Sequence, residues 1–237
     1  MEGLAGLVYP RKCHACKDKL SQASVEKLIC SRCWSGIKKN TPPFCRCCGR
    51  RLNKAAFTKN ICLRCQKTTL HFDRAFSPCV YDGVIRELIH QFKYNGKEYL
   101  GRPLSRLMSD FIKEYELPMD ELDYIIPMPL HKTRLREREF NQAEILSGFI
   151  AGEFKKELLK NILLRSRHSR SQTELAITER LHNVRDSFSI AAQDKIRGKN
   201  LLLVDDVLTS GATSSEAAYA LKKNGGANIV FVLTLAN

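Results

Sequence analysis

Long apolar runs are absent from this sequence. Its longest apolar stretch, around residues 229–236, is less than half of the ~18 residues that a membrane-spanning helix needs. The first ten residues lack the basic start and the apolar centre of a signal peptide. We therefore expect a cytoplasmic protein that does not insert into membranes.

Acidic residues are scarce in the first third of the chain. Residues 1–70 carry 15 Lys and Arg but only 3 Asp and Glu, a net charge of +12. The whole chain has 39 Lys and Arg and 25 Asp and Glu. Residues 71–237 therefore hold 24 basic and 22 acidic side chains and contribute only +2 to the net charge. This asymmetry predicts a small basic domain at 1–70 and a larger domain at 71–237.

The composition excludes disordered and collagen-like chains. Hydrophobic residues make up 43% of the sequence and charged residues 27%, which are the proportions of a globular protein. A length of 237 residues suffices for one domain of ordinary size and a small one.

Ten cysteines occur in the chain, and in a cytosolic protein they indicate metal or redox chemistry before structural disulfides. Within residues 13–33, two C-x-x-C motifs are separated by a gap of 13 residues. The same arrangement is repeated 32 positions later, within residues 45–65. Two such turns can direct four sulfurs at one Zn²⁺, and the metal then helps to fold a segment with little core of its own. We predict two structural zinc sites, formed by Cys13, Cys16, Cys30, Cys33, Cys45, Cys48, Cys62 and Cys65.

The sequence leaves alternatives to this interpretation open. The two sites could form within each repeat or from interleaved pairs. A disulfide framework would need export, and a thioredoxin-like motif would occur once within a βαβ unit. Cys47 and Cys79 are left as packing residues or free thiols, and His14 could in principle replace a sulfur.

The cysteine-rich module stays basic after metal binding. Eight thiolates contribute −8 and two Zn²⁺ contribute +4, which changes the +12 of residues 1–70 to +8. Trp34, Phe44 and Phe57 lie among these charges, and basic residues with aromatics suit single-stranded nucleic acid. The aromatics could equally form the core of a tiny domain, and we favour that interpretation for them.

From residue 71 onward, strand and helix patterns alternate. The patterns predict strands at 75–81, 123–128, 162–165, 188–190, 200–204 and 229–235, and helices over 84–92, 104–115, 141–154 and 214–223. The alternation predicts an α/β domain with a mainly parallel sheet. The almost wholly apolar segment 200–204 suits the middle of that sheet.

Two carboxylates follow this central strand. Asp205 and Asp206 come directly after it, and a hydroxyl-rich turn with Gly211 opens the next helix. Open α/β sheets bind ligands at the carboxyl ends of their strands, and turn amides at a helix N-terminus favour a phosphate. The spacing fits a pentose phosphate, with its diol on the carboxylates and its 5′-phosphate in the turn. Receiver domains and Mg²⁺-dependent phosphotransferases also carry paired aspartates, but they lack this turn.

Residues 201–213 resemble the thirteen-residue PRPP-binding motif of type I phosphoribosyltransferases. With the cysteine repeats, the whole chain is similar to the ComF family of competence-associated proteins. The resemblance extends to residues 127–130 and 134–142, to residues 165–175 with 179–180 and 183–184, and to the patch His90, Lys93 and Gly96. It implies a type I phosphoribosyltransferase fold behind a double zinc ribbon.

For the site, the resemblance implies PRPP bound with Mg²⁺. Asp205 and Asp206 would hold the ribose diol, and Arg134 and Arg138, with Lys93, would offset charge on the departing pyrophosphate. Residues 165–180 would close over the substrate, or would form a basic track for single-stranded nucleic acid. The 5′-phosphate would be gripped by Thr209, Ser210, Gly211, Ala212 and Thr213.

One departure from the family pattern concerns Glu139, which stands where the family usually has glycine. Glutamate would be strained there if the position needs a positive φ, and its carboxylate would lie near the proposed diphosphate. Ser210 and Ser169 stand where threonine is more usual, and both keep a hydroxyl group.

Two functions therefore stand against each other. One is a PRPP-dependent transfer of phosphoribose, linked to DNA uptake or nucleotide metabolism. The other is a non-catalytic PRPP or nucleotide sensor whose ribbons bind single-stranded DNA or a helicase partner, because the fold also has regulatory members. The acid pair and the phosphate turn argue against a plain zinc-ribbon adaptor. No residue identifies the acceptor or the oligomeric state.

Overall fold

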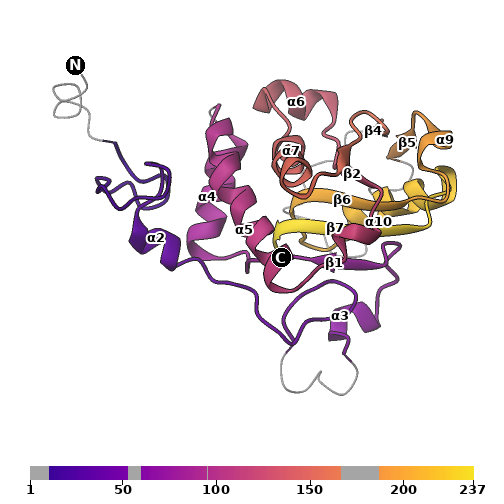
Figure 1. The fold of residues 1–237 in the computed structure, drawn as a ribbon, viewed down its shortest axis with the longest axis horizontal. Helices are drawn as coiled ribbons and strands as arrows, with labels where there is room; N and C mark the ends of the chain where they lie inside the picture. Colours follow the sequence, from indigo (N-terminus) through magenta and orange to yellow (C-terminus); the bar gives the residue numbers. More distant parts are fainter. Residues whose placement is uncertain (1–10, 53–59, 95, 167–186) are drawn as a thin grey trace.

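A computed structural model describes residues 11–52, 60–94, 96–166 and 187–237 (Figure 1). Its centre is a parallel five-stranded sheet in the order β1-β7-β6-β2-β3. The predicted α/β class with a mainly parallel sheet is thereby confirmed. The strands of this sheet are β1 (Arg74–Phe76), β2 (Tyr124–Pro127), β3 (Glu157–Leu158), β6 (Asn200–Val207) and β7 (Ile229–Ala236).

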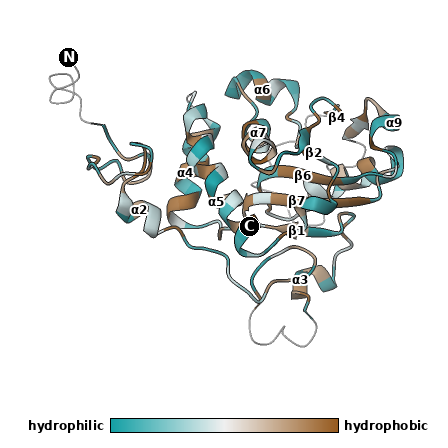
Figure 2. Ribbon diagram, viewed as in Figure 1, coloured by the Kyte–Doolittle hydropathy of each residue, from teal (hydrophilic) through white to brown (hydrophobic). Residues whose placement is uncertain are grey.

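Both faces of the sheet are buried, which explains the nearly continuous apolar sequence of β6. Leu202 and Val204 belong to the core on the side of helices α4 (Gly83–Lys93), α5 (Gly101–Glu114) and α7 (Gln142–Phe154). Leu201 and Leu203 belong to the core on the side of α10 (Ala212–Tyr219) and the π-helical turn η4 (Ala220–Asn224). Figure 2 shows the apolar colour concentrated in β6 and β7 and the hydrophilic colour on the outer helices.

The elements predicted after residue 71 are present, but several differ in their bounds or pairing. Strand β6 runs to Val207 instead of ending at residue 204, so Asp205 and Asp206 lie in its last residues and not after it. The helix predicted at 214–223 begins at Ala212 and changes to the π-helical turn η4 at Ala220. Strand β1 ends at Phe76 instead of residue 81, because Pro78 has no N–H to donate to a neighbouring strand. The segments β4 (Leu163–Arg165) and β5 (Phe188–Ile190) pair antiparallel in a separate two-stranded sheet. Shorter elements are α2 (Ser31–Ser35), α3 (Leu63–Gln66), η2 (Glu98–Leu100), η3 (Met119–Glu121), α6 (Lys132–Arg138) and α9 (Gln193–Ile196). In the part of the chain described here, every helix is too short or too polar to span a bilayer.

The two cysteine repeats occupy different places on the larger domain (Figure 1). The first lies beside α4, and its buried Ile29 and Ile37 belong to the same core as α4 and α5. The second lies against the edge strand β1, where the N–H of Ala75 donates to the Cys47 carbonyl at 2.8 Å. A Cβ at Gly49 would lie 2.2 Å from the Ala75 carbonyl oxygen, and φ there is +66°, so this close approach requires glycine.

Candidate functional site

The eight predicted zinc ligands form two groups of four. Within Cys13, Cys16, Cys30 and Cys33, and likewise within Cys45, Cys48, Cys62 and Cys65, the sulfurs all lie within 4.8 Å of one another. The Sγ–Sγ distance is 3.8 Å between Cys16 and Cys30 and 3.7 Å between Cys48 and Cys62. A tetrahedral Zn²⁺ with Zn–S bonds of ~2.3 Å places its sulfurs about 3.8 Å apart. The residues therefore fit zinc, and each repeat forms its own site.

The residues left over from the two zinc groups have packing roles. His14 is outside the first group, and its ring lies 5.4 Å from that of Tyr99. Cys79 is fully buried, and burial raises the pKa of its thiol to about 12. Phe44 packs edge-on against Phe111 and Tyr115, with ring centres 5.8 and 5.1 Å away. Phe44 is thus a packing residue, as we favoured, whereas Phe57 lies outside the described residues.

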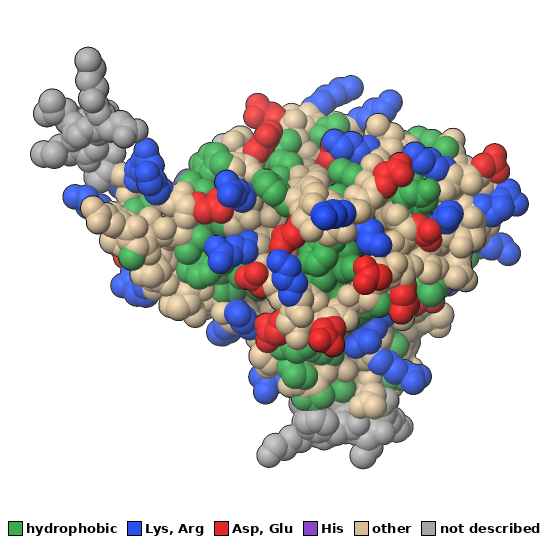
Figure 3. All heavy atoms as spheres, viewed as in Figure 1, with side chains coloured by type: hydrophobic (Ala, Val, Ile, Leu, Met, Phe, Trp, Pro, Cys, Tyr) green, Lys and Arg blue, Asp and Glu red, His purple; other side chains and the backbone are tan. Residues whose placement is uncertain are grey.

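Basic side chains do not form a separate patch on the face shown in Figure 3. There, the Lys and Arg side chains of the described residues are interspersed with Asp and Glu. A contact between the ribbons and nucleic acid stays a prediction.

A large cleft lies at the carboxyl end of β6. Its volume is about 780 Å³, and it brings together residues from β4, β6, α4, α6 and the start of α10. Every predicted PRPP-binding residue lines it except Ala212, which is buried behind it as the first residue of α10. The predicted lining residues are Lys93, Arg134, Arg138, Asp205, Asp206, Thr209, Ser210, Gly211 and Thr213.

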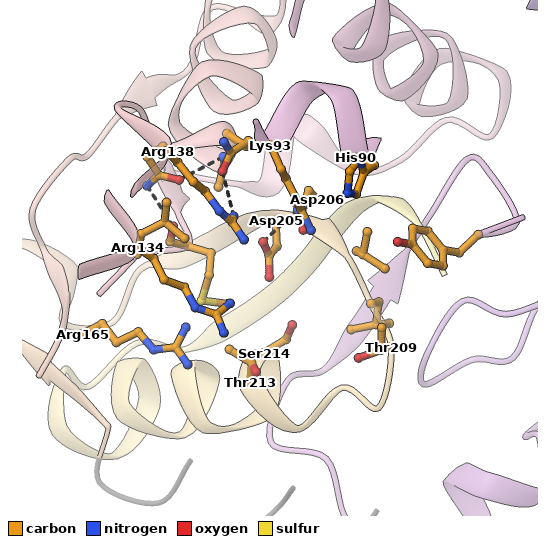
Figure 4. A pocket seen from close by; sticks show the side chains of 18 of the residues that line it. His90, Lys93, Arg134, Arg138, Arg165, Asp205, Asp206, Thr209, Thr213 and Ser214 are labelled. Carbon is orange, nitrogen blue, oxygen red and sulfur yellow. Dashed lines mark hydrogen bonds and ion pairs between the residues drawn. The ribbon is translucent and has the colours of Figure 1, made fainter. Parts of the chain in front are cut away.

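The acid pair lies at the centre of the cleft (Figure 4). The carboxylate of Asp205 accepts a hydrogen bond from the Asp206 backbone N–H at 2.8 Å, and Asp206 forms an ion pair of 2.6 Å with the Lys93 ammonium. Burial, with the negative charge of Asp206 beside it, raises the pKa of Asp205 to about 7. The site therefore holds one paired carboxylate and one that titrates near neutrality.

The turn after β6 has the shape of an anion cradle. Gly211 has φ of 79°, a left-handed conformation that glycine adopts without steric cost, and α10 begins at the next residue. The Ser210 hydroxyl accepts from the Ala212 N–H at 3.3 Å. Thr213 and Ser214 lie at the N-terminus of α10 beside the cleft (Figure 4), where the helix dipole favours negative charge.

Three arginines lie at the opposite side of the cleft from Thr209 (Figure 4). Arg134 and Arg138 come from α6, and Arg165 comes from the end of β4. Arg138 donates to the Gln142 side-chain oxygen at 3.0 Å and stacks 5.6 Å from the ring centre of Tyr94. Burial of Arg165, with repulsion from Arg134, lowers its pKa. Several guanidinium groups held together in this way suit a polyanion such as diphosphate.

Glu139 adopts the left-handed conformation that a glycine would favour, with φ of 68° at the C-cap of α6. The expected backbone strain is therefore present. The expected carboxylate beside the diphosphate is not what the structure shows: Glu139 lines a separate groove with Glu98 and Phe149, and Glu137 lines the large cleft in its place.

The pocket includes residues that the sequence did not point to. Tyr81 and Tyr94 line the cleft and are 37% and 41% exposed. Tyr81 is the last residue of the strand predicted at 75–81, and Tyr94 follows the helix predicted at 84–92; neither pattern indicated a side chain in a cleft. Of the loop predicted at 165–180, residues 167–180 lie outside the described part of the chain.

The comparisons with known proteins agree with this arrangement. A family model described as a double zinc ribbon domain matches residues 4–69. The chain is 33% identical to Competence protein F of Haemophilus influenzae over 58% of this chain and 62% of the relative. It is 29% identical to Competence protein ComFC of Bacillus subtilis, over 65% of this chain and 60% of the relative. It is 27% identical to DNA utilization protein YhgH of Escherichia coli strain K12, over 67% of this chain and 70% of the relative.

These matches span less than two thirds of the length of the first two relatives. They nevertheless combine with two zinc sites of the predicted spacing and with a parallel α/β domain behind them. The chain is thus similar to competence and DNA utilization proteins and matches a double zinc ribbon domain, in agreement with the resemblance to the ComF family that the sequence motifs indicated.

Proposed function

We propose that this chain binds PRPP and transfers its phosphoribosyl group to an acceptor. The observation that carries the proposal is the set of groups that one cleft brings together: a phosphate turn, two carboxylates and three arginines. PRPP carries a group suited to each of them, namely a 5′-phosphate, a ribose diol and a diphosphate. We also propose that residues 71–237 form the unit that binds it.

The two acids hold the sugar in this proposal. Ionised carboxylates accept hydrogen bonds from the 2′- and 3′-hydroxyls. They also stabilise the positive charge that develops on the ribose as its bond to pyrophosphate breaks. The amides of the turn and the N-terminus of α10 fix the 5′-phosphate, so that remote binding energy orients the reacting carbon.

The arginines hold the leaving group. Arg134, Arg138 and Arg165 face the same part of the cleft and can neutralise pyrophosphate as it departs. Lys93 lies between the two ends and pairs with Asp206 at 2.6 Å. Mg²⁺, bound together with PRPP, would add charge neutralisation on the diphosphate and the diol, and the carboxylates offer the oxygen ligands it prefers.

The relatives suggest where the reaction is used. Three of them carry names that refer to competence or DNA utilization. We propose a role of this chain in DNA uptake or in the use of imported nucleotides. Single-stranded DNA, a helicase-type partner and nucleobases are then candidates for the acceptor or for binding to the ribbons.

Calorimetry with PRPP and Mg²⁺ tests the assignment of the site. Asp205→Ala with Asp206→Ala should weaken PRPP binding by at least about 100-fold, because two charge-assisted contacts are lost. The matched control is Asp110→Ala with Asp194→Ala, since both of those carboxylates are exposed and lie outside the cleft. Undiminished affinity in the first variant, with an unchanged melting temperature, would reject the site.

Pyrophosphate release separates the enzyme from a sensor. We expect release from PRPP in the presence of a nucleobase or a single-stranded oligonucleotide, and none from the Asp205 and Asp206 variant. PRPP binding without release across these acceptors would favour the non-catalytic alternative.

A further inference from the structure

The second zinc ribbon touches the back of the phosphate turn. Arg64, in α3, donates from Nη1 to the carbonyl oxygen of Thr209 at 2.6 Å. Arg50 of the same ribbon approaches that oxygen with Nη2 at 3.5 Å. A narrow space behind the turn is lined by Cys48 and Cys65 together with these arginines. The turn therefore lies between the zinc site on one side and the cleft on the other.

The segment that follows the ribbon supports the same turn. Leu70 and Phe72 lie 3.5 and 3.8 Å from the Cβ position of Gly211. The His71 N–H donates to the Ser215 hydroxyl, in the first turn of α10, at 3.0 Å. Residues 64–72 thus contact one side of the turn in two ways: by apolar packing on Gly211, and by hydrogen bonds to the Thr209 carbonyl and the Ser215 hydroxyl.

Peptide geometry relates this contact to the ligand. In a trans peptide the C=O of one residue and the N–H of the next point in opposite directions. The ribbon holds the Thr209 carbonyl on its own side, so the N–H of Ser210 points away from the ribbon, toward the cleft that Ser210 lines. Among the described residues, none accepts a hydrogen bond from that N–H.

We propose that Arg64 is a positioning residue for the phosphate site and that the second zinc ribbon is a structural part of that site. The inference rests on the proposed function, because it takes the turn to bind the 5′-phosphate. Cys62 and Cys65 flank Arg64 in the sequence, so the fold of the metal site determines where its guanidinium lies. Arg64 itself contacts no ligand; it orients a peptide that does.

Ribose 5-phosphate and pyrophosphate, measured separately by calorimetry, distinguish the two ends of the cleft. Arg64→Ala should weaken ribose 5-phosphate binding about tenfold, which corresponds to the loss of one hydrogen bond to a charged group. Pyrophosphate binding at the arginines of α6 and β4 should stay unchanged. Arg64→Lys retains a cationic donor and should restore most of the affinity.

The control is Lys67→Ala, which removes one positive charge from the same ribbon at an exposed position outside the cleft. It should leave the affinity for both ligands unchanged, so equal losses in Lys67→Ala and Arg64→Ala would point to net charge and overturn the positioning role. Zinc analysis must give two ions per chain for each variant. Should Arg64→Ala lose metal, Arg64→Gln decides the question, because it is polar and keeps the aliphatic stem but is two bonds shorter than arginine and ends before the Nη1 position that contacts Thr209.

The outcomes separate the two proposals. Absence of binding of ribose 5-phosphate and PRPP to the unaltered chain would contradict the proposed function. Binding to the unaltered chain with equal affinity in Arg64→Ala and Arg64→Gln would contradict only the role of Arg64. Weaker ribose 5-phosphate binding with unchanged pyrophosphate binding supports the role.

Discussion

At the scale of single residues, Asp205 shows how the cleft sets the chemistry of a carboxyl group. Its side chain is held beside Asp206, whose own charge is paired with Lys93 at 2.6 Å. Burial and the neighbouring charge raise the pKa of Asp205 to about 7, so near neutral pH it exchanges between a neutral and an ionised form. Only the ionised form accepts hydrogen bonds with both oxygens, so ligand binding and proton loss are coupled.

The affinity for PRPP should therefore depend on pH. Below pH 7 Asp205 is mostly protonated, so PRPP binding must be accompanied by loss of that proton. Above pH 7 the carboxylate is already ionised and accepts the ribose hydroxyls without this cost. We expect the affinity to rise from pH 6 to pH 8, by up to ~10-fold per pH unit where the group is protonated, with proton release detectable by calorimetry in buffers of different ionisation enthalpy.

Asp205→Asn isolates this contribution from the titration of the 5′-phosphate itself. The variant should bind PRPP more weakly, and the part of the pH dependence that belongs to the carboxyl group should disappear. An identical pH profile in both proteins would show that another group takes up the proton.

At the scale of elements, local patterns predicted what depends on local sequence. The acid pair, the turn and each C-x-x-C motif are each encoded within a few residues; the structure brings the acid pair and the turn into one cleft and the eight cysteines into two groups of four. Strand β5 was predicted with its bounds, and its start is marked by the change from polar residues to Phe188. The separation of β4 and β5 from the central sheet was not predicted, because their periodicity does not say which strand each will pair with.

Contacts between distant segments had no signal in the sequence. Arg64 and Thr209 are 145 positions apart, and their hydrogen bond depends on how the ribbon docks against β1. Tyr81 and Tyr94 line the cleft because β1 and α4 end where they do. The pairing of zinc ligands within each repeat was likewise left open, since the spacing allowed both patterns until the sulfur positions were known.

The zinc sites allow a direct test at this scale. The intact chain should contain two Zn²⁺, and Cys62→Ser should reduce this to one, because three thiolates do not complete a tetrahedral site. Cys47→Ser should keep both ions, since Cys47 is outside either group. Metal content is measured by releasing zinc from the denatured protein into a colorimetric chelator. Loss of zinc from Cys47→Ser would mean that the ligand set differs from the one assigned.

At the scale of the whole molecule, the ribbons and the α/β domain share a core. Ile29 and Ile37 of the first repeat lie in the same cluster as Ile85 and Leu104 of helices α4 and α5. The charge of +12 in residues 1–70 marks a boundary in sequence composition. The domain boundary near residue 70 stays a prediction, but the shared core implies that both parts unfold together.

The single tryptophan makes this implication measurable. Trp34 lies in α2 of the first ribbon and packs against the shared core. Its fluorescence therefore reports the ribbon, whereas far-ultraviolet circular dichroism reports mainly the helices of the larger domain. The two signals should change at the same denaturant concentration, because apolar surface buried between the parts is lost in one step.

A substitution at the contact between the two parts tests the same point. Phe44→Ala, which removes the ring packed against Phe111 and Tyr115, should lower the free energy of unfolding by about 2 kcal/mol and shift both transitions equally. Leu63→Ala serves as the control, since that side chain is 68% exposed and its loss should cost less than about 0.5 kcal/mol. A fluorescence transition that precedes the dichroism transition would show instead that the ribbon unfolds on its own, and the shared core would then contribute little to the stability of the α/β domain.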